Sequence, residues 1–198
     1  MKHVILARHG ESAFSVNDIM NGDPLVSGPL TATGREEARR MGIELADREI
    51  ALCITSEFER TQETADLALE GRDVPRLVLS DFDDVRMGMF EQHPVEEFRT
   101  WQTDRGPADV IPGGGESRVE VIRRYCRAFR EVLARQEDEI LLIAHGLPVT
   151  GALLAARGQD VPPTLKGVQV GYAQPATLSA EQLERAVSRL EAWADRAG

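Results

Sequence analysis

The nine residues VILARHGES, Val4 to Ser12, place four apolar residues directly before an arginine, a histidine and a glycine. A continuous apolar run is typical of a strand that is covered on both faces, as in a parallel sheet. Burying a guanidinium or an imidazole without a partner costs several kcal/mol. The end of this strand is therefore expected to face an anionic group that Arg8 and His9 can bind.

The same strand character recurs along the chain, and helical segments alternate with it. Apolar runs at 50–54 (IALCI), 76–79 (RLVL) and 139–144 (EILLIA) predict three more strands. Apolar residues at helical spacing predict helices near 33–45, 57–69, 94–103, 116–135 and 179–196, with a further helix after 145. This alternation predicts an α/β fold, a three-layer α/β/α sandwich with a mostly parallel central sheet.

Length, composition and charge limit the classes of protein to consider. The chain has 198 residues, 42% of them hydrophobic, so we expect one domain over residues 1–198. The formal net charge of -10 argues against nucleic acid or an anionic membrane as partner, because both are bound by clustered Lys and Arg. No apolar run is long enough for a signal peptide or a membrane span, which predicts a cytoplasmic protein. The sequence is compatible with a monomer and with a homodimer.

The cysteines and histidines show no pattern typical of a metal site. Cys53 and Cys126 lie far apart, without a C-x-x-C pair, and are expected to be small core residues in a reducing compartment. The histidines show no H-x-H or H-x-x-x-H spacing; they are His3, His9, His93 and His145. We therefore expect neither a metal nor a cofactor.

Two of the predicted strands end in a histidine. Ligands of parallel sheets bind beyond the carboxyl ends of the strands. Arg8 and His9 follow the first strand, and His145 follows the strand at 139–144. The sequence therefore predicts that both imidazoles lie at one edge of the sheet.

A helix N-terminus is expected at the same edge. Arg60 falls on the first turn of the helix that follows the strand at 50–54, and Thr55 or Ser56 is expected to cap that helix. Two arginines beside a helix N-terminus suit a phosphate group. The anion expected beside Arg8 is therefore a phosphoryl group.

Four motifs in this order resemble the histidine phosphatase superfamily, also called the phosphoglycerate mutase-like family. They are RHGES at 8–12, SEFERTQETA at 56–65, GGGES at 113–117 and AHG at 144–146. Each motif alone is a weak signal, but together they cover nearly the whole chain. The resemblance implies a phosphoglycerate mutase-like fold.

The resemblance also implies the roles of four residues. His9 matches the nucleophile that accepts the phosphoryl group as phosphohistidine, and Arg8, Arg60 and His145 match the groups that hold the phosphate oxygens. Neutral imidazole is a competent nucleophile near neutral pH, and guanidinium groups stabilise the charge on the transferred phosphoryl group. This chemistry requires no metal.

The general acid is the role for which the sequence departs from the family pattern. The family has a glutamate four residues before a glycine after the third strand, whereas this chain has Asp84 four residues before Gly88. Asp84 is the first candidate, and Asp83 and Asp81 are its competitors. Ser15 is a second departure, because the mutases of the family carry an asparagine at that place.

Other residues in these motifs have structural interpretations beside the functional ones. Arg60 could pair with Glu57 or Glu63 on its own helix instead of binding phosphate. Glu11 could orient the backbone, and Ser117 could cap the long helix that follows it, or either could contact substrate.

Three functions compete for this sequence: a phosphatase for a small phosphomonoester, a mutase, and a non-catalytic member of the fold. Mutases of the family insert a lysine-bearing segment after the acid, whereas residues 88–113 contain no lysine and are net acidic. This favours the phosphatase. Asp84 and Ser15 keep the non-catalytic alternative open, since fold alone does not decide function. The residues that select the substrate are expected between about 86 and 115.

Overall fold

The computed structural model describes residues 1–162, 164–165 and 167–198. Its central sheet has the strand order β3-β2-β4-β1-β5. The strands are β1 (His3–Arg8), β2 (Leu52–Thr55), β3 (Arg76–Val78), β4 (Glu139–Ala144) and β5 (Ala176–Ser179). Neighbouring strands from β3 to β1 are parallel, and β5 pairs antiparallel with β1.

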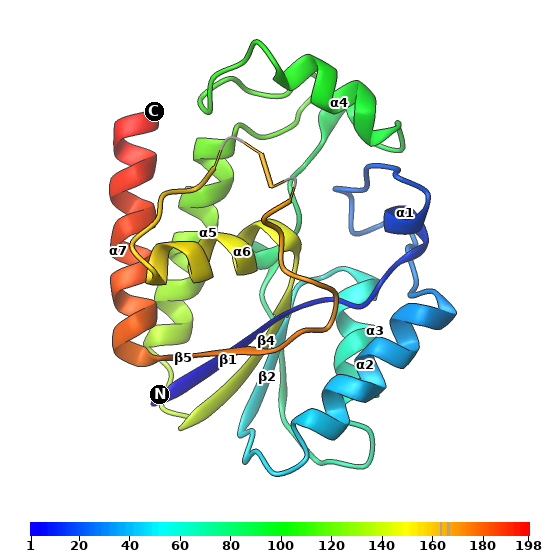
Figure 1. Ribbon diagram of the computed structural model, residues 1–198, viewed down its shortest axis with the longest axis vertical. Coiled ribbons are helices and arrows are strands. Elements are labelled where there is room, and N and C mark those ends of the chain that lie inside the picture. Colours follow the sequence, from blue (N-terminus) through cyan, green and yellow to red (C-terminus); the bar gives the residue numbers. More distant parts are fainter. Residues whose placement is uncertain (163, 166) are drawn as a thin grey trace.

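The helices cover both faces of this sheet (Figure 1). They are α1 (Ala13–Val16), α2 (Ala32–Glu44), α3 (Glu59–Ala68), α4 (Val95–Gln102), α5 (Arg118–Leu133), α6 (Gly146–Ala156) and α7 (Ala180–Ala197), with short 3-10 turns at Ser80–Phe82 and Gly88–Phe90. Ile5 and Ala7 of β1 pack with apolar residues of α2 and α3, whereas Val4 and Leu6 pack with those of α5, α6 and α7. The predicted three-layer α/β/α fold is confirmed.

The structure corrects the prediction at three places. β5 and α1 were not among the predicted elements, because ATLS at 176–179 has no continuous apolar run and α1 spans only four residues. β5 forms because His3–Leu6 offers it a free edge for antiparallel pairing. β2 spans Leu52–Thr55, where the strand was predicted at 50–54. Such shifts at element ends are expected from local pattern alone.

The sheet brings the two histidine-bearing strand ends together. β1 and β4 are adjacent, with Arg8 paired in register with Ala144. The His9 N–H donates to the Ala144 carbonyl at 3.0 Å, so the ladder continues to the functional residues. Gly10 follows, and a Cβ there would lie 2.4 Å from the Gly34 carbonyl oxygen. A glycine is therefore required where this loop crosses α2.

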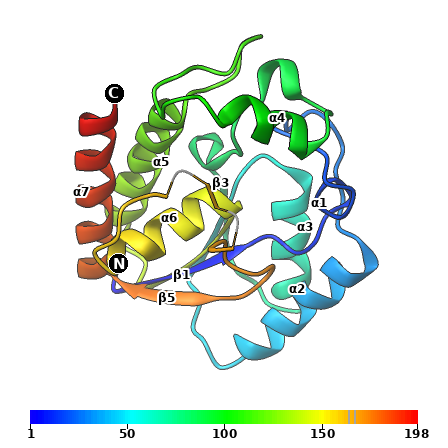
Figure 2. The same cartoon turned by 45° about the horizontal axis from the view of Figure 1, so that its top comes forward.

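The segment between β3 and α5 lies outside the three layers. Figure 2 shows its helix α4 at the top of the molecule. Met87, Phe90 and Ile111 form a small apolar cluster there, against Phe98 and Trp101 of the α4 region. This segment thus has its own core, separate from the two that flank the sheet.

Two further findings concern the rest of the described chain. Cys53 and Cys126 are free and buried, as predicted for core residues. Among the described residues, no helix combines the length and the apolar character that crossing a membrane requires.

Candidate active site

His9 lies at the carboxyl end of β1 and is 4% exposed. Its Nδ1 is 2.7 Å from the Gly10 carbonyl oxygen. A carbonyl oxygen can only accept a hydrogen bond, so Nδ1 carries the proton and Nε2 keeps its lone pair. The ring also lines the large cavity of the molecule. The backbone thus selects the tautomer that a phosphoryl acceptor needs.

His145 lies beside His9 at the end of β4 and is fully buried. The two ring centroids are 5.4 Å apart. Its Nε2 is 2.9 Å from the Ser56 hydroxyl, and its Nδ1 is 3.3 Å from Asp84 Oδ2. The second pair is within ion-pair distance but lacks hydrogen-bond geometry, so Nδ1 has no hydrogen-bond partner among the described residues. That buried nitrogen lies beside Asp84, a residue of the cavity, but His145 itself does not line the cavity that contains His9.

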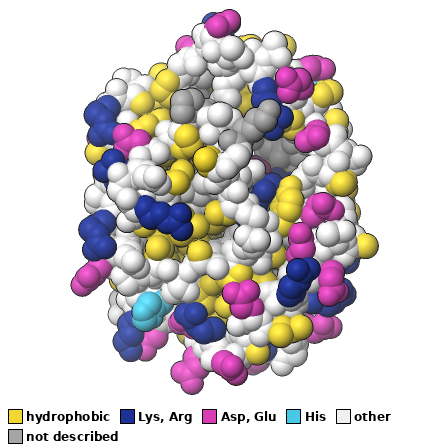
Figure 3. Space-filling model, viewed as in Figure 1, with side chains coloured by type: hydrophobic (Ala, Val, Ile, Leu, Met, Phe, Trp, Pro, Cys, Tyr) yellow, Lys and Arg dark blue, Asp and Glu magenta, His cyan; other side chains and the backbone are white. Residues whose placement is uncertain are grey.

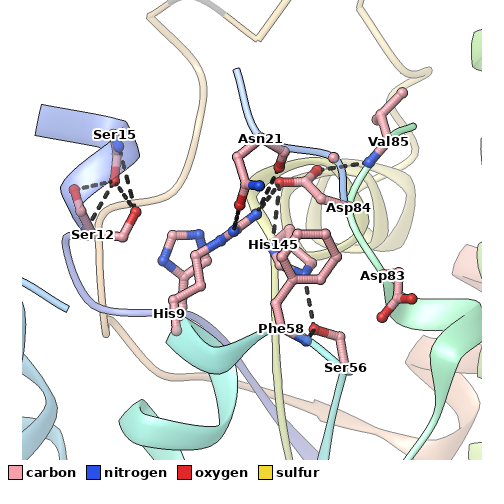
Figure 4. A network of polar contacts seen from close by, with 12 residues as sticks. His9, Ser12, Ser15, Asn21, Ser56, Phe58, Asp83, Asp84, Val85 and His145 are labelled. Carbon is pink, nitrogen blue, oxygen red and sulfur yellow. Dashed lines mark hydrogen bonds and ion pairs between the residues drawn. The ribbon is translucent and has the colours of Figure 1, made fainter. Parts of the chain in front are cut away.

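Arg60 lies on the first turn of α3, is 3% exposed and, like His145, approaches Asp84. Its Nη2 donates to Asp84 Oδ2 at 3.0 Å, and its Nη1 to Asn21 Oδ1 at 2.5 Å. The Phe58 ring lies 4.2 Å below the guanidinium carbon. Figure 4 shows Asn21, Asp84 and His145 close to one another. The alternative pairing of Arg60 with Glu57 or Glu63 is wrong.

Arg8 approaches from the other side of His9. Its guanidinium carbon stacks 3.8 Å from the centre of the Tyr172 ring, and Nη1 contacts the Val170 carbonyl at 3.5 Å. The buried Nε has no hydrogen-bond partner in the described part of the chain. An anion would supply the acceptor that this buried donor lacks.

The pKa shifts agree with a site that attracts anions. Burial, followed by the charges of Arg60, His145 and Arg8, holds the pKa of His9 well below its usual value. Burial, Arg60 and Arg8 do the same for the pKa of His145. Both imidazoles are therefore neutral at neutral pH. Two guanidinium groups then supply the positive charge, and neutral His9 keeps its nucleophilic lone pair.

The three candidate acids lie in different surroundings. Asp84 alone of the three lines the cavity that contains His9. Asp83 accepts the Glu57 N–H at 2.8 Å, and Asp81 pairs with Arg127 at 3.2 Å. Both line a second cavity of about 470 Å³, which Asp84 lines as well. Burial raises the pKa of Asp83 to about 6. Figure 4 shows Asp83 pointing away from the group formed by Asp84 and His145.

The structure places the remaining sequence candidates as follows. Ser15 lines the cavity and forms a capping box with Ser12 at the start of α1. Glu11 accepts the Thr31 hydroxyl at 2.7 Å, at the start of α2. Ser117 caps α5 through the Glu120 N–H. Glu11 and Ser117 are not among the lining residues of the cavity, so their observed contacts are structural.

The predicted capping of α3 by Thr55 or Ser56 is wrong. The N-cap is Phe58, which makes no side-chain cap bond. The buried Ser56 hydroxyl instead lies 2.9 Å from both His145 Nε2 and the Thr61 hydroxyl.

Two more residues of the site, Asn21 and Tyr172, were missed by sequence reasoning. Both come from irregular segments without periodicity. Asn21 lies in the Gly/Pro-rich stretch that follows the first strand, and this was its only sequence signal.

A cavity of about 900 Å³ opens from this group of residues. Arg8, His9, Arg60 and Asp84 line one part of it. Its other walls carry both charged and large apolar side chains; the charged ones include Glu96, Arg99 and Arg105, and the apolar ones include Phe14, Phe98, Trp101, Leu147 and Trp193. The cavity thus combines a cationic part for a phosphate with apolar walls for the remainder of a ligand.

We also considered whether the residues could hold a metal. Within the described residues, no group of three or more His, Cys, Asp or Glu side chains is arranged to bind a metal ion. The guanidinium groups of Arg8 and Arg60 supply the positive charge that a phosphate requires.

At the carboxyl edge of this α/β sheet lie a neutral imidazole with a free nitrogen, the buried Arg60, the partly buried Arg8 and a second imidazole. Together they define a phosphoryl-transfer class of site. Comparison with known proteins is more specific: the family model of the histidine phosphatase superfamily (branch 1) matches residues 4–196. The chain belongs to this superfamily.

Individual relatives agree with the family assignment. The adenosylcobalamin/alpha-ribazole phosphatase of Salmonella typhimurium is 30% identical over 76% of this chain and 76% of its own length. The phosphatase PhoE of Bacillus subtilis is 29% identical over 81% and 80%. The structure of YhfR from Bacillus stearothermophilus superposes with a TM-score of 0.76 at 26% identity, covering 89% and 90% of the two chains. A phosphoglycerate mutase of Gloeobacter violaceus also matches, at 28% identity over 88% and 84%. The predicted family and the predicted enzyme class, a phosphatase, are confirmed.

Proposed function

We propose that this chain hydrolyses a small phosphomonoester through a phosphohistidine on His9. His9 Nε2 attacks phosphorus as the bond between phosphorus and the ester oxygen breaks, and Arg8, Arg60 and His145 bind the other phosphate oxygens. Asp84 donates a proton to the leaving oxygen. Water then attacks phosphorus, breaks the bond to nitrogen and gives its proton to Asp84, which releases phosphate and restores the enzyme.

The observation that carries this proposal is the hydrogen bond from His9 Nδ1 to the Gly10 carbonyl. It leaves Nε2 with a lone pair on a buried ring, and the low pKa of His9 keeps that lone pair available at neutral pH. Asp84 lies 3.3 Å from His145 Nδ1 and 3.0 Å from Arg60, so its carboxyl group is beside the place of the phosphate.

The apolar walls of the cavity favour a phosphatase over a mutase. A mutase must hold a small, multiply charged substrate while it returns the phosphoryl group. Phe98 and Trp101, from the segment predicted to select the substrate, instead present apolar surface. This segment contains no lysine between residues 88 and 113. We therefore propose water as the acceptor. The apolar part of the walls suits an apolar portion of the leaving group, and Arg99 and Arg105 on the same walls suit a polar portion.

His9→Ala tests the proposal. We expect the variant to lose at least about a thousandfold in kcat/KM for 4-nitrophenyl phosphate, about 4 kcal/mol in barrier, because the covalent route is lost. Rapid quenching of wild type with labelled substrate should trap an acid-labile phosphoprotein that is absent from the variant. Residual activity above about a tenth of wild type, a loss below 1.4 kcal/mol, would exclude His9 as nucleophile.

The proposal includes neither a metal nor a cofactor, and activity is expected to survive excess chelator. Loss of activity on chelation that zinc or magnesium restores would contradict it. We further propose one cytoplasmic domain over residues 1–198 that acts on small molecules. The net charge of -10 and the interspersed acidic and basic side chains on the face drawn in Figure 3 support a partner other than nucleic acid or membrane.

A further inference from the structure

The backbone of the loop that carries Asp84 accepts three hydrogen bonds from the guanidinium of Arg124 in α5. Arg124 is 8% exposed, and its Nη1 donates to the Asp81 carbonyl at 3.1 Å and to the Asp83 carbonyl at 2.8 Å. Its Nη2 donates to the Asp84 carbonyl at 3.1 Å. Arg124 does not line the cavity that contains His9. It therefore contacts the backbone of the acid loop and not the place of the substrate.

Glu116 fixes the orientation of that guanidinium. Its Oε1 accepts Arg124 Nε at 2.9 Å and its Oε2 accepts Nη2 at 2.7 Å, a two-pronged pair on a carboxylate that is 3% exposed. The same carboxylate accepts the Arg86 N–H at 3.0 Å. Arg124 thus holds the loop up to residue 84, and Glu116 holds it at residue 86. Unlike Arg124, Glu116 also lines the cavity that contains His9, so Arg124→Lys is the variant that separates positioning from substrate contact.

A neighbouring residue adds a further contact. The Tyr125 hydroxyl donates to the Asp83 carbonyl at 3.0 Å, so that carbonyl accepts two hydrogen bonds from α5. The loop has no strand ladder at these residues. Side chains of α5 therefore fix the backbone of this loop, as strand pairing fixes the backbone at His9 and His145.

A short acid needs such support. An aspartate is one methylene shorter than the glutamate of the family pattern, so its carboxyl position follows the backbone more closely. Backbone movement at residue 84 would directly change the distances from its Oδ2 to Arg60 and to His145, which are 3.0 and 3.3 Å. Displacement of about an ångström is enough to impair a catalytic group.

We propose that Arg124, oriented by Glu116, is a positioning residue that places Asp84 for proton donation. This inference rests on the proposed function of Asp84 as general acid. The rival interpretation is that the buried pair only attaches the loop to α5 and stabilises the fold. The two interpretations predict different results when the pair is disrupted. If Arg124 positions Asp84, the loss of activity depends on the leaving group and requires the Asp84 carboxyl; if the pair only stabilises the fold, it does neither.

The test uses Arg124→Lys, which keeps a positive charge beside Glu116 but cannot bond three carbonyls and both carboxylate oxygens together. Glu116→Gln is the second variant; it keeps the side-chain shape and perturbs the pair from the other partner. Arg127→Lys is the matched control, because Arg127 lies one turn further along α5 and contacts the same loop only through the exposed Asp81 carboxylate. Each is measured alone and combined with Asp84→Asn, on glycerol phosphate and on 4-nitrophenyl phosphate.

We expect Arg124→Lys and Glu116→Gln to lower kcat/KM for glycerol phosphate by about tenfold or more, and for 4-nitrophenyl phosphate by less than about threefold. In the Asp84→Asn background, the additional loss should be less than about twofold, because the proton donor is already absent. Arg127→Lys should leave both substrates unchanged.

Three results would overturn the inference: equal losses for the two substrates, an undiminished loss in the Asp84→Asn background, or wild-type kinetics in both variants. A different result would overturn the proposed acid itself. If Asp84→Asn loses no more activity on glycerol phosphate than on 4-nitrophenyl phosphate, Asp84 is not the acid and Arg124 has nothing to position.

Discussion

The proposed nucleophile, His9, and the proposed acid, Asp84, line one cavity but are held in different ways. His9 and His145 follow adjacent parallel strands, so backbone pairing and burial on both sides of the sheet fix them. Asp84 lies on a loop whose backbone accepts hydrogen bonds from Arg124 and Tyr125 and donates one, from the Arg86 N–H, to Glu116. The difference shows that the two histidines are positioned by strand pairing, whereas the proposed acid is positioned by side-chain contacts that can vary separately.

The two regions also differ in charge. The strand-end region contains neutral imidazoles whose pKa values are lowered by burial and by arginines. The loop region contains carboxylates in mixed surroundings: burial raises the pKa of Asp83 to about 6, whereas the pKa of Glu116 is lowered because its pair with Arg124 outweighs its burial. Substitutions in each region should therefore give different pH and substrate dependences.

Among the substitutions that change only one of the two regions, Asp84→Asn should have the largest effect on activity. An alkoxide needs a proton as it leaves, whereas a nitrophenolate hardly does. We expect about a hundredfold loss of kcat/KM for glycerol phosphate, about 2.7 kcal/mol in barrier, and a much smaller loss for 4-nitrophenyl phosphate. Steady-state kinetics on both substrates is the measurement. Asp83→Asn is the control, and a larger substrate-dependent loss in that variant would transfer the role of acid to Asp83.

A smaller effect concerns the two buried histidines, His9 and His145, which should make the free energy of unfolding depend on pH. Their folded pKa values lie well below the ordinary value, so below about pH 6.5 the unfolded chain binds protons that the folded chain does not. Stability should therefore fall as pH decreases, by up to about 1.4 kcal/mol per pH unit for each histidine.

Urea unfolding of wild type and His145→Gln between pH 7 and 5 measures this slope. The variant should show a shallower decrease, since one of the two groups is gone. The exposed His93 provides the control His93→Gln. An unchanged slope in His145→Gln would show that His145 is already protonated in the folded protein.

The smallest effect is expected from Asp83→Asn. The folded pKa of Asp83, about 6, exceeds the unfolded value of about 3.9, so the folded state loses stability as pH rises between these values. The Asp83→Asn substitution removes this loss of stability, and the asparagine side chain can still accept the Glu57 N–H. We expect a stabilisation on the order of 1 kcal/mol at pH 8, reduced by solvent screening of the half-exposed group. Thermal unfolding at pH 8 and pH 4 checks it; a gain of equal size at both pH values would contradict it.

Several contacts of the site lay beyond sequence reasoning for a common reason. Asn21 and Tyr172 lie in stretches without periodicity, yet they contact Arg60 and Arg8 from 39 and 164 positions away along the chain. Serine is a common helix-capping residue, which is why Ser56 was predicted to cap α3. In the folded protein, His145 at the end of β4 lies within hydrogen-bond distance of its hydroxyl instead. Local propensity cannot show which distant group will lie within hydrogen-bond distance.

The sequence by itself determined the parts whose signal is local: the apolar runs that become β1, β2, β3 and β4, and the polar residues placed directly after them. Because parallel strands share one carboxyl edge, this alone predicted that Arg8, His9 and His145 meet. Only the tertiary structure decided which of three neighbouring aspartates lines the cavity, and it did so through Arg124 and Tyr125 from a helix more than thirty positions away. Periodicity reports burial within an element, whereas the direction of a loop carboxylate depends on long-range hydrogen bonds to its backbone.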